Sequence, residues 1–127
     1  METVAYLDTH VLAWLYAGEL ERLSEKGREL VRSGSLRVSP AARLELQHLY
    51  ELGRTRAPAR TVVRVLADTL GLAVCSLPFE KVVEASERQS WTRDPFDRLI
   101  VAQASLSGAS LLTKDRTIHE HYARAVW

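Results

Sequence analysis

Residues 4–17 read VAYLDTHVLAWLYA, and this stretch decides the fold of the chain. Its first four residues, 4–7, form a short apolar run that is typical of a buried strand. Residues 9–17 then space apolar side chains as a helix does, and Gly18 follows as a helix stop. Asp8 stands between the two patterns. The sequence therefore predicts a strand that leads directly into a helix, with a carboxylate at the junction.

The same alternation of strand and helix patterns continues to the end of the chain. Further strands are expected at Leu36–Ser39, Leu72–Leu77 and Ser110–Thr113, with an edge strand at Arg124–Trp127. Helices are expected at Ser24–Arg32, Ala41–Leu52, Pro58–Leu70, Phe79–Arg88, Asp94–Ser107 and Asp115–Tyr122. This order predicts an α/β fold, a three-layer α/β/α sandwich with a central, mostly parallel sheet. In such sheets ligands collect at the carboxyl ends of the strands.

Length and composition bound the class of protein. We expect one domain over residues 1–127, with the ordinary balance of 46% hydrophobic and 26% charged residues. The net charge of +1 neither requires nor excludes a nucleic-acid partner. A single cysteine, Cys75, cannot form an internal disulfide and indicates a reducing compartment. The N-terminus lacks the basic start of a signal peptide and its apolar run is too short to span a membrane, so we expect a cytoplasmic protein.

Three acids stand where helices are expected to begin. Asp8 and Asp115 follow predicted strands, and Asp94 precedes a helix that Pro95 opens. Aspartate is a favoured helix N-cap worth roughly 1 kcal/mol, so capping is the plain explanation for each of them taken alone.

Capping cannot explain two further acids, Glu45 and Asp97. On helical wheels both fall on apolar faces. Glu45 lies with Ala42, Leu46, Leu49 and Leu52, and Asp97 lies with Ile100, Val101 and Ala104. An unpaired carboxylate on a buried face costs several kcal/mol, so it must be paired, protonated or bound to a metal. Salt bridges to Arg98 or Lys114 are the structural alternative. Because the two acids accompany two strand-end acids, we favour a hard divalent cation and metal-dependent phosphoryl transfer.

Three motifs carry a family resemblance: LDTHVL at 7–12, DPFDRLIVAQA at 94–104 and LTKD at 112–115. Together they resemble the PIN-domain family, and most closely its VapC-like ribonuclease toxins from toxin–antitoxin pairs. The resemblance covers nearly the whole chain. It implies a PIN-like α/β/α fold, RNA as substrate, cleavage dependent on Mg²⁺ or Mn²⁺, and a cognate antitoxin as partner. It leaves a homodimer open.

The resemblance also assigns roles by motif position. The catalytic and metal-binding acids would be Asp8, Glu45, Asp97 and Asp115. Supporting residues would be Asp94, beside the site, and Thr9 and Thr113, whose hydroxyls would lie near the metal or its waters. Glu51 is the alternative to Glu45, although it faces the polar side of its helix.

Several further residues are candidates for binding. Arg56, Arg60 and Arg64 have helical spacing and form either a solvated face or a row of RNA phosphate contacts. Trp91 lies in a polar loop, where it either stacks on a base or covers a core edge. Apolar residues of the early helices are expected to meet an antitoxin: Leu12, Leu15, Leu20 and Leu23.

Other functions fit less well. A haloacid-dehalogenase-like phosphatase requires a second aspartate two positions after the first, where this chain has His10. A housekeeping PIN-type nuclease and a catalytically inactive PIN-like RNA- or protein-binding module remain alternatives. The complete acidic set favours an active enzyme.

Overall fold

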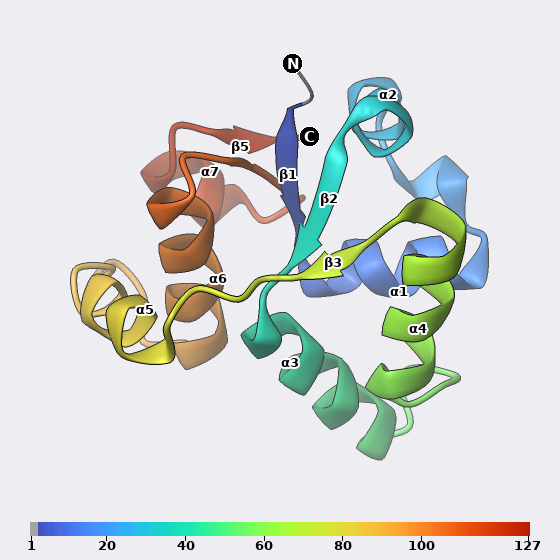
Figure 1. Cartoon of the computed structure of the whole chain (residues 1–127), viewed down its shortest axis with the longest axis horizontal. Helices are drawn as coiled ribbons and strands as arrows, with labels where there is room; N and C mark the ends of the chain where they lie inside the picture. Colours follow the sequence, from blue (N-terminus) through green and yellow to red (C-terminus); the bar gives the residue numbers. More distant parts are fainter. Residues whose placement is uncertain (1–2) are drawn as a thin grey trace.

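The strand that follows the N-terminus lies at the centre of the sheet (Figure 1). The structure is a computed structural model and describes residues 3–127. Its strands are β1 (Val4–Leu7), β2 (Ser35–Val38), β3 (Ala73–Val74), β4 (Ser110–Leu112) and β5 (Ala125–Val126). Their order is β3-β2-β1-β4-β5, and every neighbouring pair is parallel. The parallel sheet expected from the sequence is confirmed.

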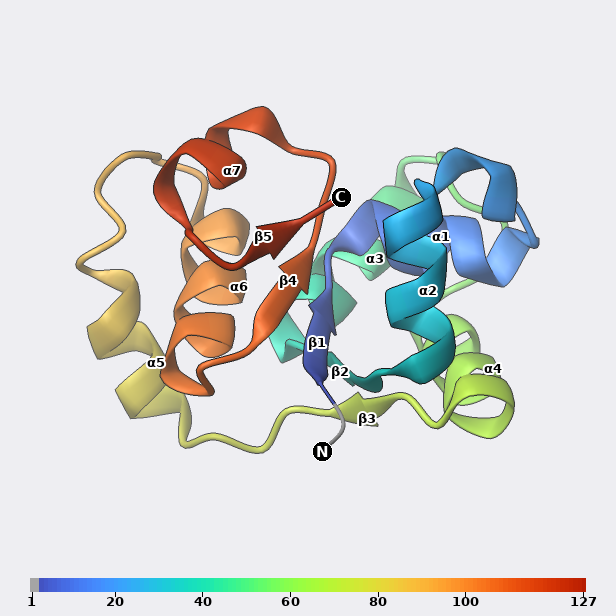
Figure 2. The ribbon, with the colours of Figure 1, turned by 90° about the horizontal axis from the view of Figure 1, so that it is seen from above.

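Seven α-helices and one short 3₁₀ helix surround this sheet in the described residues. They are α1 (Thr9–Ala17), η1 (Leu20–Arg22), α2 (Glu25–Ser33), α3 (Pro40–Glu51), α4 (Ala59–Leu70), α5 (Phe79–Ser86), α6 (Pro95–Leu106) and α7 (Arg116–His121). Helices α1, α2 and α4 lie on one side of the sheet, and α5, α6 and α7 on the other (Figures 1 and 2). Helix α3 contacts both α1 and α6, so it joins the two layers.

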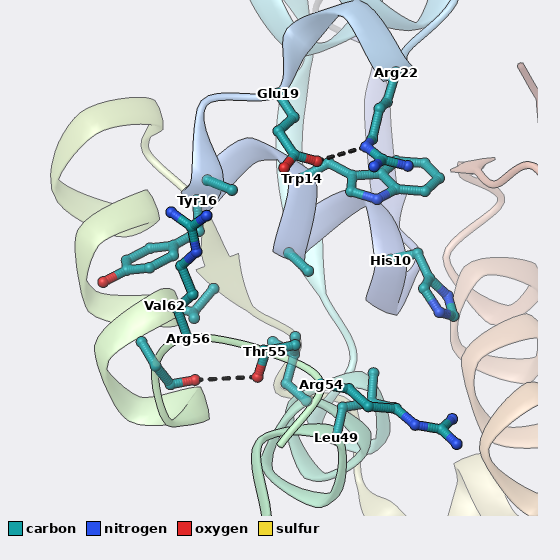
Figure 3. Close-up of a pocket in the computed structure, with 14 residues that line it drawn as sticks. His10, Trp14, Tyr16, Glu19, Arg22, Leu49, Arg54, Thr55, Arg56 and Val62 are labelled. Carbon is teal, nitrogen blue, oxygen red and sulfur yellow. Dashed lines mark hydrogen bonds and ion pairs between the residues drawn. The ribbon is translucent and has the colours of Figure 1, made fainter. Parts of the chain in front are cut away.

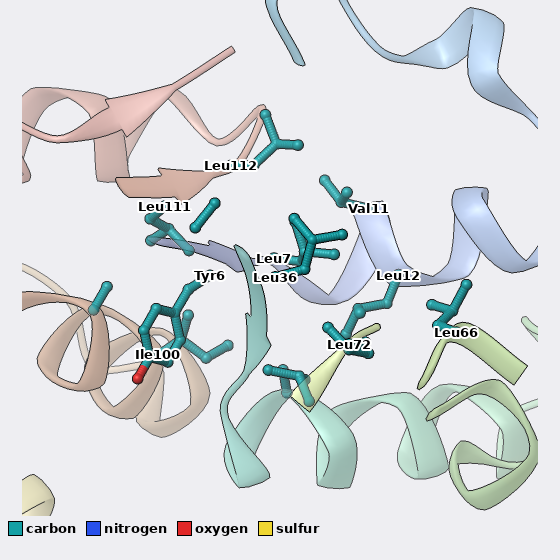
Figure 4. Close-up of a cluster of buried hydrophobic side chains, with 14 of the residues drawn as sticks. Tyr6, Leu7, Val11, Leu12, Leu36, Leu66, Leu72, Ile100, Leu111 and Leu112 are labelled. Carbon is teal, nitrogen blue, oxygen red and sulfur yellow. The ribbon is translucent and has the colours of Figure 1, made fainter. Parts of the chain in front are cut away.

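The core explains why the strands read as continuous apolar runs. Ala5, Tyr6 and Leu7 of β1 are each at most 2% exposed because helices cover both faces of the sheet. Figure 4 shows Tyr6 and Leu7 among buried side chains from the helices and from β2 and β4. The Tyr6 hydroxyl donates to Cys75 Sγ at 2.9 Å. The burial of the Tyr6 side chain, together with this hydrogen bond, raises the pKa of Tyr6 to about 12. Cys75 is a buried free thiol, as expected.

Three sequence expectations need correction. The strand expected at Leu72–Leu77 pairs only over Ala73–Val74; Cys75 N adds one bond of 2.8 Å to Val38 O, and Pro78 then precedes α5. Arg56 is not helical, because α4 begins at Ala59.

The third correction concerns the expected antitoxin contacts. Leu12 is fully buried and Leu23 is only 3% exposed, because both side chains belong to the hydrophobic core. Neither can meet a partner protein. Leu15 is half-buried, whereas Leu20 is 49% exposed. No helix in the described part of the chain is both long enough and apolar enough to cross a membrane.

Candidate active site

A pocket of about 430 Å³ lies at the carboxyl edge of the sheet, where β1 and β4 end. All five acids singled out in the sequence line it: Asp8, Glu45, Asp94, Asp97 and Asp115. His10, Val11, Trp14 and Lys114 complete the wall. The fold thus brings together carboxylates that are far apart in the sequence, the most distant being Asp8 and Asp115, which are 107 positions apart.

The pairing of β1 with β4 places the first acid. Leu7 lies opposite Leu112, and the next amide, Asp8 N, donates to Leu112 O at 3.0 Å. This register sets Asp8 beside Thr113, whose hydroxyl donates to Asp8 Oδ2 at 2.6 Å. Asp8 also caps α1, because its Oδ1 accepts from Thr9 N at 2.8 Å. Both oxygens of this carboxylate are therefore held by the protein.

Two buried threonines fix the acids in place. Thr9 and Thr113 are fully buried, and the Thr9 hydroxyl donates to Glu45 Oε1 at 2.5 Å. Thr113 Oγ1 in turn accepts from Asp115 N at 3.1 Å. These hydroxyls therefore orient carboxylates directly.

Asp94 and Asp115 are indeed helix caps. Asp94 Oδ1 accepts from Phe96 N at 2.8 Å and from Asp97 N at 3.2 Å, and Asp115 Oδ1 accepts from Ile118 N at 3.0 Å. In both residues only Oδ1 is used in the capping bonds found within residues 3–127. Capping and cation binding are therefore compatible at these two positions.

Asp97 is the least satisfied of the acids. It is half-buried, and no hydrogen bond or ion pair to its carboxylate is found within residues 3–127. Burial, and after it the neighbouring charges of Asp94, Asp8, Asp115 and Glu45, together raise its pKa to about 7.

Burial and mutual repulsion act on the other central acids too. The pKa of Glu45 is raised by burial and by Asp8 and Asp94, against the lowering effect of the Thr9 hydrogen bond. The pKa of Asp8 is raised by burial and by Asp115, against the Thr113 and Thr9 hydrogen bonds. The site therefore concentrates negative charge that the surrounding side chains do not neutralise.

The salt bridges considered as an alternative do not form. Arg98 Nε donates to Thr92 O at 2.8 Å, and Lys114 Nζ lies 6.0 Å from the centre of the Trp127 ring. The ion pairs found between residues 3 and 127 are Arg22–Glu19 and Arg32–Glu29, neither of which includes a pocket acid. The carboxylates thus lack a protein counter-charge in direct contact.

The donor set fits a hydrated hard cation. Among residues 3–127, no group of three or more His, Cys, Asp or Glu side chains is arranged so that it could hold a metal ion by itself. Magnesium-type ions keep several waters and use one or two carboxylates together with substrate phosphates, so they do not need such a group. Oxygen donors without a cysteine fit Mg²⁺ or Mn²⁺ better than they fit a structural zinc ion.

The remaining sequence candidates lie outside this pocket. Glu51, the alternative to Glu45, is exposed and accepts from Gln47 Nε2 at 2.9 Å. Trp91 stacks on His121 with ring centres 4.9 Å apart, and its Nε1 donates to Gln89 Oε1. Arg60 and Arg64 are exposed on α4.

Two pocket residues, His10 and Trp14, were not among the site residues expected from the sequence. His10 is exposed and Trp14 half-buried. Their position two and six residues after Asp8, on the first turns of α1, is the signal that points to them.

Comparison with known proteins agrees with this architecture. The PIN domain family model matches residues 5–124. Ribonuclease VapC22 of Mycobacterium tuberculosis is 31% identical over 125 residues, which cover 94% of this chain and 92% of that protein.

Solved structures show the same fold. VapBC2 from Rickettsia felis, bound to a DNA fragment from its promoter, gives a TM-score of 0.61 at 14% identity and covers 98% of this chain and 96% of that chain. A toxin–antitoxin complex from Klebsiella pneumoniae gives 0.62 at 19% identity, with 97% and 96% covered. With the family model spanning nearly its whole length, the chain belongs to the PIN-domain family.

Proposed function

We propose that this protein is a metal-dependent endoribonuclease and the toxin of a toxin–antitoxin pair. The observation that carries the proposal is the pocket of five carboxylates, none of which forms an ion pair within residues 3–127. The similarity to Ribonuclease VapC22 supports RNA as the substrate. We expect the enzyme to act in the cytoplasm, where RNA and the antitoxin are found.

The proposed site consists of Asp8, Glu45, Asp97 and Asp115, with Asp94 in support. Mg²⁺ or Mn²⁺, when bound there, would activate water and offset charge on the phosphodiester. The chain itself supplies the positions of the ligands.

Asp8 and Glu45 are held rigid by Thr9 and Thr113, whereas Asp97 stays free to bind the ion. Lys114 lines the same pocket and offers its ammonium group to the phosphate of an incoming RNA chain.

A toxin of this kind needs a neutralising partner in its own cell. The similar solved structures include VapBC proteins and a toxin–antitoxin complex, which supports an antitoxin as the partner here. A homodimer is compatible with the proposal, because the exposed apolar residues Leu44 and Phe79 lie outside the acidic pocket.

The direct test is cleavage of RNA by the purified protein. We expect internal cuts with Mg²⁺ or Mn²⁺, none with EDTA, and recovery when the metal is returned. Expression of the protein without its antitoxin should arrest growth, and the Asp8→Ala substitution should relieve the arrest. Cleavage without growth arrest would indicate a housekeeping nuclease. RNA binding without cleavage would indicate an inactive binding module.

A further inference from the structure

A second pocket, of about 290 Å³, shares a wall with the acidic one. His10 and Trp14, both from α1, line both pockets. Figure 3 shows these two side chains among the residues that line the second pocket. The opposite wall comes from the end of α3 and from the segment that joins α3 to α4.

The joining segment is held in a defined path. Gly53, with a φ of 76°, ends the helical region in the left-handed conformation that favours glycine. Arg54 N then donates to Leu49 O at 2.9 Å, and Gln47 Oε1 accepts from Ala59 N at 3.1 Å. These bonds tie both ends of the segment to α3, so Arg54 and Arg56 start from a fixed backbone at the pocket.

The second pocket carries positive charge. Arg22, Arg54 and Arg56 line it, and Glu19 is its one acid. Glu19 is already paired with Arg22 at 2.5 Å. No ion pair to Arg54 or Arg56 is found within residues 3–127. The charge therefore changes sign across the wall formed by His10 and Trp14, from carboxylates on one side to guanidinium groups on the other.

The shared wall is aromatic and held in place. Trp14 meets the Trp127 ring edge-on at 5.9 Å, and the guanidinium of Arg22 lies 5.7 Å from the Trp14 ring centre. The His10 ring is tilted against Trp14 at 6.1 Å. Aromatic rings and arginine planes that are already positioned are the groups on which proteins stack unpaired RNA bases.

We propose that this second pocket binds the nucleotide next to the scissile phosphate. In this proposal Arg54 and Arg56 contact RNA phosphates, and the wall of Trp14 and His10 contacts the base. It rests on the proposed function, since an RNA strand over the acidic pocket must place its neighbouring nucleotide across the shared wall. A polyanion needs cationic partners there, and this pocket supplies them.

The chain provides a matched control for the arginines. Arg60 and Arg64 are exposed on α4, a few residues further along, but line neither of the two pockets. A general attraction between RNA and basic residues would involve both pairs alike. Binding in the second pocket requires only Arg54 and Arg56.

The test compares two double variants, Arg54→Ala/Arg56→Ala and Arg60→Ala/Arg64→Ala. Both are made in the Asp97→Asn background so that the RNA stays intact, and binding of a fluorescent ten-nucleotide single strand is measured in Mg²⁺ at several salt concentrations. We expect the Arg54→Ala/Arg56→Ala variant, the pocket pair, to lose about tenfold in affinity for the RNA or more. Its salt dependence should flatten by about 1.4 in log–log slope, from two phosphates at about 0.7 each. The Arg60→Ala/Arg64→Ala variant, the control pair, should bind the RNA within about twofold of the affinity of the Asp97→Asn parent.

A second readout follows the wall itself. The indole N–H groups of Trp14 and Trp91 can be followed by nuclear magnetic resonance once each is assigned by substitution. Trp91 is held by its hydrogen bond to Gln89 and its stack on His121. Titration with the same RNA should move the Trp14 signal and leave that of Trp91 in place. Equal losses in the two double variants, or an unmoved Trp14 signal, would overturn the proposal.

The outcomes also separate this proposal from the proposed function. One outcome is that wild type cuts no RNA with any metal while its binding of RNA still depends on Arg54 and Arg56. In that case the nuclease assignment fails, and the second pocket remains assigned as an RNA-binding site. If wild type cuts RNA while the pocket pair binds it normally, the pocket assignment fails alone. A pocket pair that binds RNA normally but loses the antitoxin would assign the pocket to a protein partner and overturn our proposal.

Discussion

The Thr9 hydroxyl donates a 2.5 Å hydrogen bond to Glu45 Oε1 and so joins the first residue of α1 to α3. The amide of the same threonine donates to Asp8 Oδ1. One fully buried residue therefore sets the positions of two acids, Asp8 at the start of α1 and Glu45 in α3. This connection also distinguishes Glu45 from the other glutamate of α3.

Glu45 and Glu51 should respond differently to the same substitution. Glu45→Gln keeps the acceptor for Thr9 but removes the charge that a hard cation requires, so RNA cleavage should fall about a hundredfold or more. Glu51→Gln should leave cleavage within about twofold, because Glu51 is exposed and lies outside the pocket. Initial rates with Mg²⁺ decide the matter. Equal effects of the two substitutions would remove Glu45 from the site.

Asp97→Asn should abolish most cleavage and yet stabilise the metal-free protein. The pKa of Asp97 is raised from 3.8 to about 7 in the folded state, so the folded protein favours the protonated carboxyl. Relative to Asp97→Asn, wild type should therefore lose stability as the pH rises from about 4 to about 7. In EDTA at pH 8 we expect the variant to melt about 4 °C higher or more.

Thermal unfolding with Mn²⁺ completes that experiment. Wild type should gain about 2.7 kcal/mol at a hundredfold excess of metal over the dissociation constant, and the variant clearly less. A lower melting temperature for metal-free Asp97→Asn would identify Asp97 as a structural partner. An undiminished Mn²⁺ shift in the variant would place the ion elsewhere.

Thr113→Val should weaken metal binding although no ligand is changed. The substitution keeps the shape of the side chain but removes the hydroxyl that holds Asp8 Oδ2 at 2.6 Å. We expect a loss of about 1–3 kcal/mol in stability and of about tenfold to a hundredfold in metal affinity. Calorimetric Mn²⁺ titration measures the latter. Thr113→Ser should restore binding, and Thr117→Val, at an exposed position of α7, should change nothing.

Asp94→Asn separates capping from catalysis at that position. Asparagine caps helices about as well as aspartate, so stability should change by less than about 0.5 kcal/mol. The negative charge that helps to raise the pKa of Asp97 is lost, and that pKa should move down. A shift of the pH–rate profile to lower pH, with cleavage reduced far less than in Asp97→Asn, is the expected result. A loss as large as that of Asp97→Asn would make Asp94 a metal ligand.

Much of the site could be predicted because it follows from local periodicity. Parallel strands end at one edge of a sheet, which brings Asp8 and Asp115 together, and helical spacing turns Asp97 toward the same side as Ile100. The contacts of Thr9 and Thr113 could not be predicted in the same way. The Thr113 contact depends on the pairing of β1 with β4, and the Thr9 contact depends on the packing of α1 against α3. Both are properties of the folded chain.

The errors have a similar cause. Leu12 and Leu23 are apolar, as residues of a partner surface often are, but both are buried in the hydrophobic core. Arg56 has helical spacing from Arg60, yet the turn after Gly53 keeps it out of α4. Tertiary packing decided each of these positions, and it acts between segments that are distant in sequence.

The hydrogen bond between Thr113 and Asp8 spans 105 positions and has a consequence for protein synthesis. A nascent chain that has not yet reached residue 110 lacks β4, Thr113 and Asp115, so Asp8 has neither its neighbouring acid nor its orienting hydroxyl. At translation rates of about 5–20 residues per second, the ribosome carries an unfinished site for several seconds. Premature termination before β4 should therefore yield a fragment in which the acidic pocket is not assembled.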